Sequence, residues 1–92
     1  MNYSKEQLEF LKSLDFMRLG QAINRGQWQS AAMTIRRLDM KAKEAGMNDF
    51  ERNFTGIRQC INRKDVNEAK QILAVVINKR AKYLNTLYER KR

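Results

Sequence analysis

The sequence contains no histidine, no proline, one cysteine and four glycines among its 92 residues. Without histidine, the chain has no imidazole general base, no Ser-His or Cys-His nucleophile pair and no imidazole metal ligand. We therefore expect a protein that is not an enzyme, with no catalytic residue, no metal site and no cofactor. The single Cys60 cannot form an internal disulfide, which fits a reducing cytoplasm, and its position on an apolar helical stripe predicts a packed rather than a reactive thiol.

Long hydrophobic runs are also missing. No apolar run approaches the ~18 residues of a membrane span, and the N-terminal segment MNYSKEQLEF lacks the apolar stretch of a signal peptide. We therefore expect a cytoplasmic protein that does not associate with membranes.

Few residues in the chain interrupt a helix, and Leu, Ala, Ile, Lys, Arg, Glu and Gln are abundant. These residue types lose little side-chain freedom in a helix, so the composition favours helix almost everywhere. A chain of this length holds one hydrophobic core. We expect residues 1–92 to form a single all-α domain.

Two helical segments are predicted near the N-terminus. Ser4 and Gln7 have the spacing of a capping box, which indicates that a first short helix begins there. Its apolar stripe is predicted to consist of Leu8, Leu11 and Leu14. Asp15 is the predicted N-cap of a second helix over residues 16–25. Alternatively, one helix runs through both segments and bends near Leu14.

Three further helices are predicted downstream. The clearest covers residues 28–45 and stops at Gly46, while Asn48 is the predicted N-cap of a helix that runs to about Arg63. Gly56 within that helix costs about 1 kcal/mol relative to alanine unless a neighbour packs closely against it. Asp65 is the predicted N-cap of the last and longest helix.

A weak internal repeat relates AINRGQWQSA, from Ala22, to CINRKDVNEA, from Cys60. Both segments have the pattern of a helix, a tight basic turn and a second helix, which predicts two hairpins of one antiparallel bundle. We therefore expect an antiparallel up-and-down four-helix bundle over residues 16–92, with an additional short helix within residues 1–15.

Two groups of residues carry a resemblance to a known family. The first comprises a turn and the helix after it: Gly26-Gln27-Trp28, Arg36-Arg37-Leu38-Asp39-Met40, Ala42, Gly46 and Phe50. The second is an apolar seam, a turn and a further apolar stripe: Phe54, Ile57, Cys60, Lys64-Asp65, Ala69 and Ile72-Leu73. In this spacing the stretch from Leu19 to about Leu84 resembles the histidine phosphotransfer domain of bacterial phosphorelays. That family is a four-helix bundle that presents one phosphorylatable histidine from the side of a helix.

The chain departs from that family at the reactive position. Arg36 stands where the resemblance implies the phosphoaccepting histidine, Asp39 stands in place of the motif lysine and Met40 in place of the motif glycine, while Leu38 is retained. A guanidinium has no accessible lone pair near neutral pH and cannot accept a phosphoryl group as imidazole does. The resemblance therefore implies a pseudo-phosphotransfer domain that keeps the shape and the docking surface without the chemistry.

A candidate partner-binding face lies on the helix over residues 28–45, beside its core stripe. It consists of Met33, Arg36, Arg37, Met40 and Lys41. Thioethers adapt to varied partners and guanidinium groups bind carboxylates in pairs. In the resembling family the same face meets the acidic pocket of a response-regulator receiver domain. We therefore expect a non-catalytic interaction or regulatory module that docks such an acidic signalling partner. Alternatively, the two methionines complete a wide core stripe and the cations are only solvated.

Nonspecific nucleic-acid binding is the competing interpretation, because the formal net charge is +9 and the pI is about 10.1. The cations that favour it are Arg18, Arg25, Arg36, Arg37, Lys41, Arg52, Arg58, Arg63, Lys64, Lys79, Arg80 and Lys82. They are scattered along the chain, and no zinc-finger or RNP-like motif accompanies them. The oligomeric state is open between a monomer and a homodimer formed through the long helix over residues 66–87.

Overall fold

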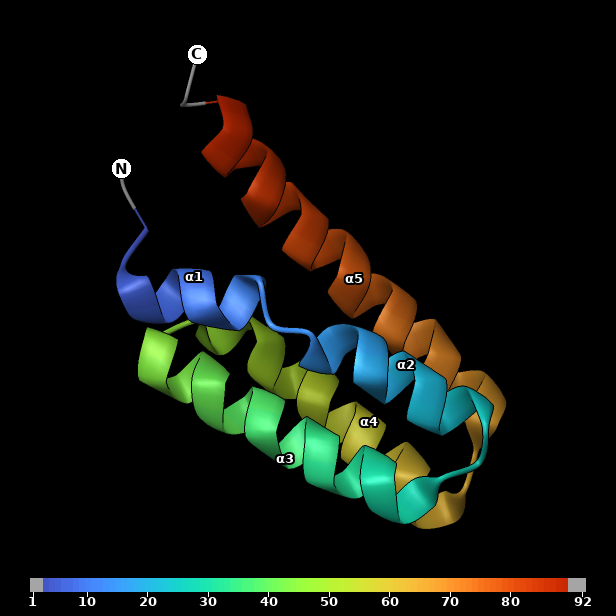
Figure 1. The fold of residues 1–92 in the computed structure, drawn as a ribbon. Coiled ribbons are helices and arrows are strands. Elements are labelled where there is room, and N and C mark those ends of the chain that lie inside the picture. Colours follow the sequence, from blue (N-terminus) through green and yellow to red (C-terminus); the bar gives the residue numbers. More distant parts are fainter. Residues whose placement is uncertain (1–2, 90–92) are drawn as a thin grey trace.

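The computed structural model describes residues 3–89, which form helices and contain no strand (Figure 1). The elements are α1 (Lys5–Leu11), α2 (Asp15–Asn24), α3 (Trp28–Ala45), the short 3-10 helix η1 (Asn48–Phe50), α4 (Glu51–Arg63) and α5 (Val66–Glu89). Each of α2 to α5 packs against the next, and α5 closes the ring against α2. α1 packs against α3 and α5 at one end of this bundle. The expected all-α four-helix bundle is confirmed.

The two predicted hairpin turns have the same backbone geometry. In the first, Gly26 has φ 67° and the N–H of Gln27 donates to the carbonyl of Ala22 at 2.8 Å. In the second, Lys64 has φ 56° and the N–H of Asp65 donates to the carbonyl of Cys60 at 2.9 Å. The sequence repeat therefore marks two equivalent helix C-termini, α2 to α3 and α4 to α5, closed by the same type of hydrogen bond.

The N-terminal helix begins as predicted. Ser4 Oγ accepts from the N–H of Gln7 at 3.1 Å, and Gln7 Oε1 accepts from the N–H of Ser4 at 2.9 Å, which completes the capping box. The expected stripe is partly wrong, because Leu14 lies beyond the end of α1 and is 60% exposed. Phe10 is buried instead, with its ring centroid 5.0 Å from that of Phe50. α1 and α2 are separate helices rather than one bent helix.

Two of the four predicted N-caps, Asp15 and Asn48, are wrong. Leu14, not Asp15, is the N-cap of α2, and the Asp15 side chain turns toward α3. Asn48 begins η1, and α4 starts at Glu51 without a side-chain cap. Asp65 caps α5 as predicted, because its Oδ1 accepts from the N–H of Glu68 at 3.1 Å. Asp15 does not cap α2 because its carboxylate is engaged by Arg37 and Lys41 instead.

The helices enclose one core of buried apolar side chains. It contains Phe10, Leu11, Phe16, Leu19, Ala22, Ile23, Ala31, Ile35, Leu38, Ala42, Ala45, Met47, Phe50, Phe54, Ile57, Cys60, Ile61, Ala69, Leu73 and Val76. Gly56 faces α5, where an added Cβ would lie 3.2 Å from Ile72 Cδ1, so a neighbour does pack closely against this glycine. The glycine allows α4 and α5 to approach each other closely.

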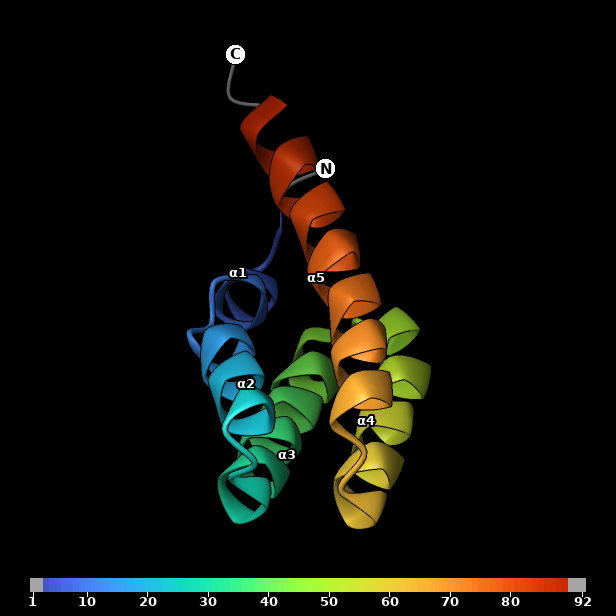
Figure 2. The same cartoon turned by 90° about the vertical axis from the view of Figure 1, so that its right-hand side faces the viewer.

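The C-terminal half of α5 extends beyond the other helices (Figures 1 and 2). Polar contacts hold the beginning of this extension: Tyr83 Oη donates to Asp49 Oδ2 at 2.6 Å, and Arg80 Nε donates to the carbonyl of Leu11 at 2.6 Å. Lys79 Nζ donates to the carbonyl of Asp49 at 2.7 Å. Within residues 3–89, no helix combines the length and the apolar character that a membrane crossing requires.

Candidate functional site

The outward face of α3 carries two exposed methionines. Met33 and Met40 are each 56% exposed, whereas Ile35 and Leu38, on the opposite side of the helix, are fully buried. The alternative in which the methionines complete the core stripe is therefore wrong. Arg36 lies between them at helical spacings of three and four and is also exposed. The outward strip of α3 is thus a methionine pair with a guanidinium between its members.

Arg37 and Lys41, predicted for the same face, turn to its flank and bind α2. Arg37 Nη2 lies 3.3 Å from Asp15 Oδ1, and Arg37 Nε lies 3.4 Å from Asp15 Oδ2. Lys41 Nζ lies 3.3 Å from Asp15 Oδ2 and 3.2 Å from Ser13 Oγ. The five predicted residues therefore divide into an outward strip (Met33, Arg36 and Met40) and a flank that faces α2 (Arg37 and Lys41).

Asp15 is the centre of that flank and was missed as a site residue by the sequence interpretation. Its side chain is only 2% exposed, yet three cations surround it, the third being Arg18 at 3.4 Å. Burial alone would raise the pKa of the Asp15 carboxyl, but hydrogen bonds and charges from Arg37 and Lys41 outweigh burial and lower it. The carboxyl is therefore ionised at neutral pH. Three cations around one carboxylate leave an excess of two positive charges at this corner.

Asp39 faces α4 instead of solvent. Its side chain is 8% exposed and its Oδ2 lies 3.0 Å from Arg58 Nη1 and 3.2 Å from Lys43 Nζ. Its Oδ1 is buried without a hydrogen-bond partner among residues 3–89. Asp39 therefore joins α3 to α4. Its spacing of four residues from Ile35 was a sequence signal that it borders the buried stripe.

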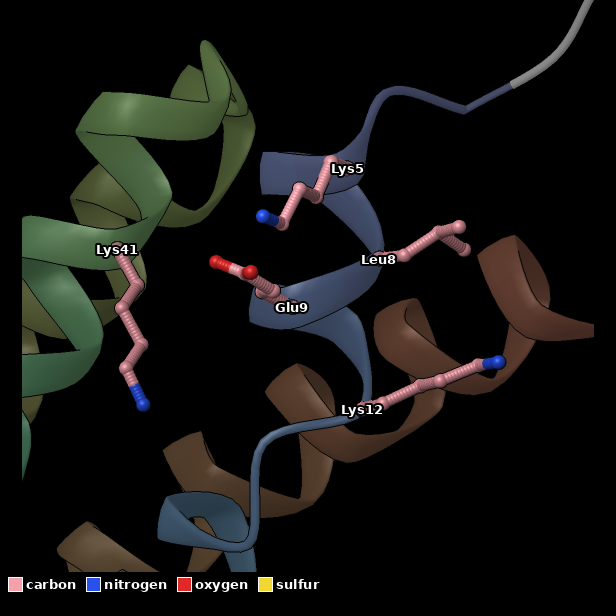
Figure 3. A pocket seen from close by; sticks show the side chains of 5 residues that line it. All are labelled: Lys5, Leu8, Glu9, Lys12 and Lys41. Atoms are coloured by element: carbon pink, nitrogen blue, oxygen red, sulfur yellow. The ribbon is translucent and has the colours of Figure 1, made fainter.

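A hollow of about 760 Å³ lies between α1 and α3 (Figure 3), and Lys41, which binds Asp15, is part of its lining. It is lined by Lys5, Leu8, Glu9, Lys12 and Lys41. In Figure 3, Lys5 and Glu9 extend from α1 toward α3, whereas Leu8 and Lys12 point away from them. Lys41 extends from α3 toward the connection between α1 and α2. The hollow therefore carries positive charge from both helices, with one carboxylate at the Lys5 end.

A second hollow, of about 510 Å³, lies between α2 and α5 and is mainly apolar. Met17, which is 57% exposed, and Ile77, which is 37% exposed, are on its walls, and Gly20 is part of its lining. None of the residues that line this hollow belongs to α3, where Met33 and Met40 lie. Met17 therefore provides an exposed methionine with which Met33 and Met40 can be compared.

The remaining reactive group is enclosed. Cys60 is fully buried, and burial, followed by the charge of Glu68, raises the pKa of its thiol. This is the packed thiol that the sequence predicted. No group of three His, Cys, Asp or Glu side chains that could hold a metal occurs in the described part of the chain. What the α3 face offers is cationic donors and adaptable apolar surface, which is the chemistry of binding an acidic partner.

No family model, no curated protein and no solved structure matches this chain.

Proposed function

We propose that this protein is a non-catalytic interaction module whose α3 face docks an acidic signalling protein, such as a response-regulator receiver domain. The outward strip (Met33, Arg36 and Met40) is the centre of the docking surface, and Arg37 and Lys41 form its edge. The observation that carries the proposal is the exposure of two large thioether side chains, each 56%, on one face of a single helix. Flexible methionines beside cations suit a partner surface that combines apolar area with carboxylates.

The free cation of this strip supports the same function. Arg36 forms no ion pair among the described residues, so its donors are available to a carboxylate of a partner. By contrast, Arg37 and Lys41 use some of their donors on Asp15, while their exposed sides stay open to a ligand. Truncating Arg36 is therefore expected to weaken docking without altering the bundle.

The resemblance to histidine phosphotransfer domains supports a receiver domain as the partner, because the helix with the reactive histidine is also their docking helix. Arg36 at the histidine position makes docking without phosphoryl transfer the expected behaviour. The purified protein should remain unlabelled when it is mixed with a phosphorylated receiver domain or a small phosphodonor. Arg36→His should also fail to restore efficient transfer, since Asp39 and Met40 still differ from the motif. An acid-labile phosphoryl label on the unaltered chain would contradict the proposal.

Docking is tested by calorimetric titration of purified receiver domains with three forms of the chain. The double variant Met33→Gln with Met40→Gln should bind at least about tenfold more weakly, because two side chains lose apolar burial. The matched control is Met17→Gln, which changes an equally exposed methionine on α2 and should bind like the unaltered chain. Absence of saturable binding, or equal weakening by the control, would refute the docking face.

Nonspecific nucleic-acid binding is the alternative, supported by the net charge of +9. Most of the cations that favoured it have partners within the chain: Arg18, Arg37, Lys41, Arg58, Arg63, Lys79 and Arg80. Those without a side-chain partner among residues 3–89 are Arg25, Arg36, Arg52, Lys64 and Lys82. A salt titration separates the two functions. For nucleic-acid binding, the logarithm of the affinity falls linearly with the logarithm of the salt concentration. Docking through Met33 and Met40 should instead persist at moderate salt.

A further inference from the structure

We propose that Arg18, Arg37 and Lys41, held together by Asp15, form a binding site for a phosphoryl dianion. The site lies at the corner where the connection between α1 and α2 meets the flank of α3. It shares Arg37 and Lys41 with the edge of the proposed docking face but not the outward strip. The ligand of this site is therefore an oxyanion, which the chain binds without any protein partner.

Buried Asp15 organises the site. Its side chain is 2% exposed, whereas Arg18, Arg37 and Lys41 are 58%, 46% and 41% exposed. The carboxylate thus holds three cationic groups from its buried side and leaves their other sides open to solvent. Because the distances are 3.3 to 3.4 Å, longer than the 2.7–2.9 Å typical of strong charge-assisted bonds, one carboxylate does not saturate three cations.

Unused hydrogen-bond donors remain at this corner. Arg37 contacts Asp15 and Thr34 through Nε and Nη2, and its Nη1 has no hydrogen-bond partner among the described residues. Ser13 Oγ accepts from the N–H of Asp15 at 3.1 Å and from Lys41 Nζ at 3.2 Å, so its own proton is free to donate. The hydroxyl, the ammonium and the guanidinium groups together supply what the oxygens of a phosphoryl group require.

The neighbouring hollow gives access and determines the position. Lys41 lines the hollow of about 760 Å³ between α1 and α3 (Figure 3). At the Lys5 end of that hollow, the nearby Glu9 carboxylate repels an anion. The phosphoryl group therefore binds at the Lys41 end, beside Ser13 and Arg37. Leu14, 60% exposed in the same connection, is available to contact the rest of the ligand.

The direct test is a titration of the purified full chain with inorganic phosphate, at ionic strength held constant with chloride and followed by heteronuclear NMR. Saturable shifts should be confined to Ser13, Asp15, Arg18, Arg37 and Lys41. A second arm compares a phosphoserine peptide with its unphosphorylated form. Tighter binding of the phosphopeptide than of phosphate identifies a protein side chain as the source of the group, and equal binding identifies a free phosphate. No saturable shift with either probe, or equal binding of the unphosphorylated peptide, would overturn the site.

The variants separate a built site from general attraction. Arg37→Gln and Lys41→Gln should each weaken phosphate binding at least about tenfold, since each removes a charge-assisted contact. Arg25→Gln, an equal change of charge at the far end of α2, should alter it less than about twofold, because screening limits its reach. Equal weakening by Arg25→Gln would show that only the net charge matters. Thermal melts show whether Arg37→Gln or Lys41→Gln fails to fold. If one of them does, phosphate binding by the other variant tests the site.

The phosphate titration and the docking test fail independently. The titration contains no protein partner, so a chain that docks nothing can still bind phosphate. Conversely, receiver binding that depends on Met33 and Met40 stands even if phosphate does not bind.

Discussion

The hydroxyl of Tyr83 donates to Asp49 Oδ2 at 2.6 Å and so joins the extended end of α5 to η1. The hydrogen bond with Asp49, followed by burial, raises the pKa of Tyr83 from 10.0 to about 12. A group whose pKa is raised on folding stabilises the fold fully below its unfolded pKa. This stabilisation should therefore be present below about pH 10 and be lost as the pH rises through about 12.

An alkaline titration of tyrosinate absorbance checks this relationship. The chain has three tyrosines, and the last to ionise should disappear in Tyr83→Phe. Asp49→Asn should lower the pKa of Tyr83 while keeping the residue. If Tyr83→Phe leaves the latest part of the titration unchanged, Tyr83 is not the perturbed tyrosine.

The equivalent turns at Gly26 and Lys64 predict opposite effects of exchanging their residues. Lys64 has φ 56° with a side chain present, so Lys64→Gly should stabilise the fold by about 1 kcal/mol. Gly26→Lys places a side chain on a backbone with φ 67° and should destabilise it by a similar amount, about 1 kcal/mol. Urea unfolding of both variants measures the difference. Destabilisation by Lys64→Gly would mean that the lysine side chain contributes more than the strain costs.

The contact of Gly56 with Ile72 predicts a coupled pair. Gly56→Ala should gain up to about 1 kcal/mol of helix propensity, offset by a new Cβ that would lie 3.2 Å from Ile72 Cδ1. Ile72→Val removes that methyl group. In the Ile72→Val background, Gly56→Ala should therefore stabilise more than it does alone, as a double-mutant cycle in urea would show. Equal effects in both backgrounds would exclude steric coupling.

The cations around Asp15 predict that the free energy of unfolding depends on pH. Asp15→Asn should destabilise the fold by about 1–3 kcal/mol at neutral pH, because it removes charged hydrogen bonds at a buried position. Folding lowers the pKa of Asp15 below its usual value of 3.8. The ionised carboxylate therefore stabilises the fold fully above pH 3.8, and this stabilisation is lost as the pH falls through the lower pKa of the folded state. Urea unfolding at pH 7 and at a pH well below 3.8 should show the difference between variant and unaltered chain shrinking in acid. A difference that does not depend on pH would assign Asp15 a packing role only.

The contact between Arg80 and Leu11 is predicted to hold the C-terminus of α1 against α5. Arg80 Nε donates to the carbonyl of Leu11 at 2.6 Å, at the C-terminus of α1, and its guanidinium lies 5.1 Å from the ring centroid of Phe16. Arg80→Gln should accelerate amide hydrogen exchange in α1 more than in α3 or α4, since it removes a link between distant segments. Lys82→Gln is the matched control, because Lys82 is exposed on the same helix. Uniform acceleration throughout the chain would indicate a global loss of stability instead.

The sequence predicted the helices where local signals act alone. The bounds of α3, the capping box at Ser4, the stop at Gly46 and the cap at Asp65 all depend on residues within one turn of the helix end. These features need no knowledge of which helix lies opposite. Helical spacing placed Met33 and Met40 beside the core stripe but left open whether they complete it, and the structure shows both exposed.

Asp15, Leu14 and Asp39 required the tertiary structure. Whether Asp15 caps α2 or binds Arg37 depends on how far α3 is rotated toward α2, and the packing of the whole core sets that rotation. The same packing turns Asp39 toward Arg58 and leaves Leu14 in solvent. By itself the sequence determined which segments are helical and those helix ends that local capping closes, because such hydrogen bonds span only three or four residues. Only the assembled bundle decided which charges meet, because contacts between helices depend on every side chain packed between them.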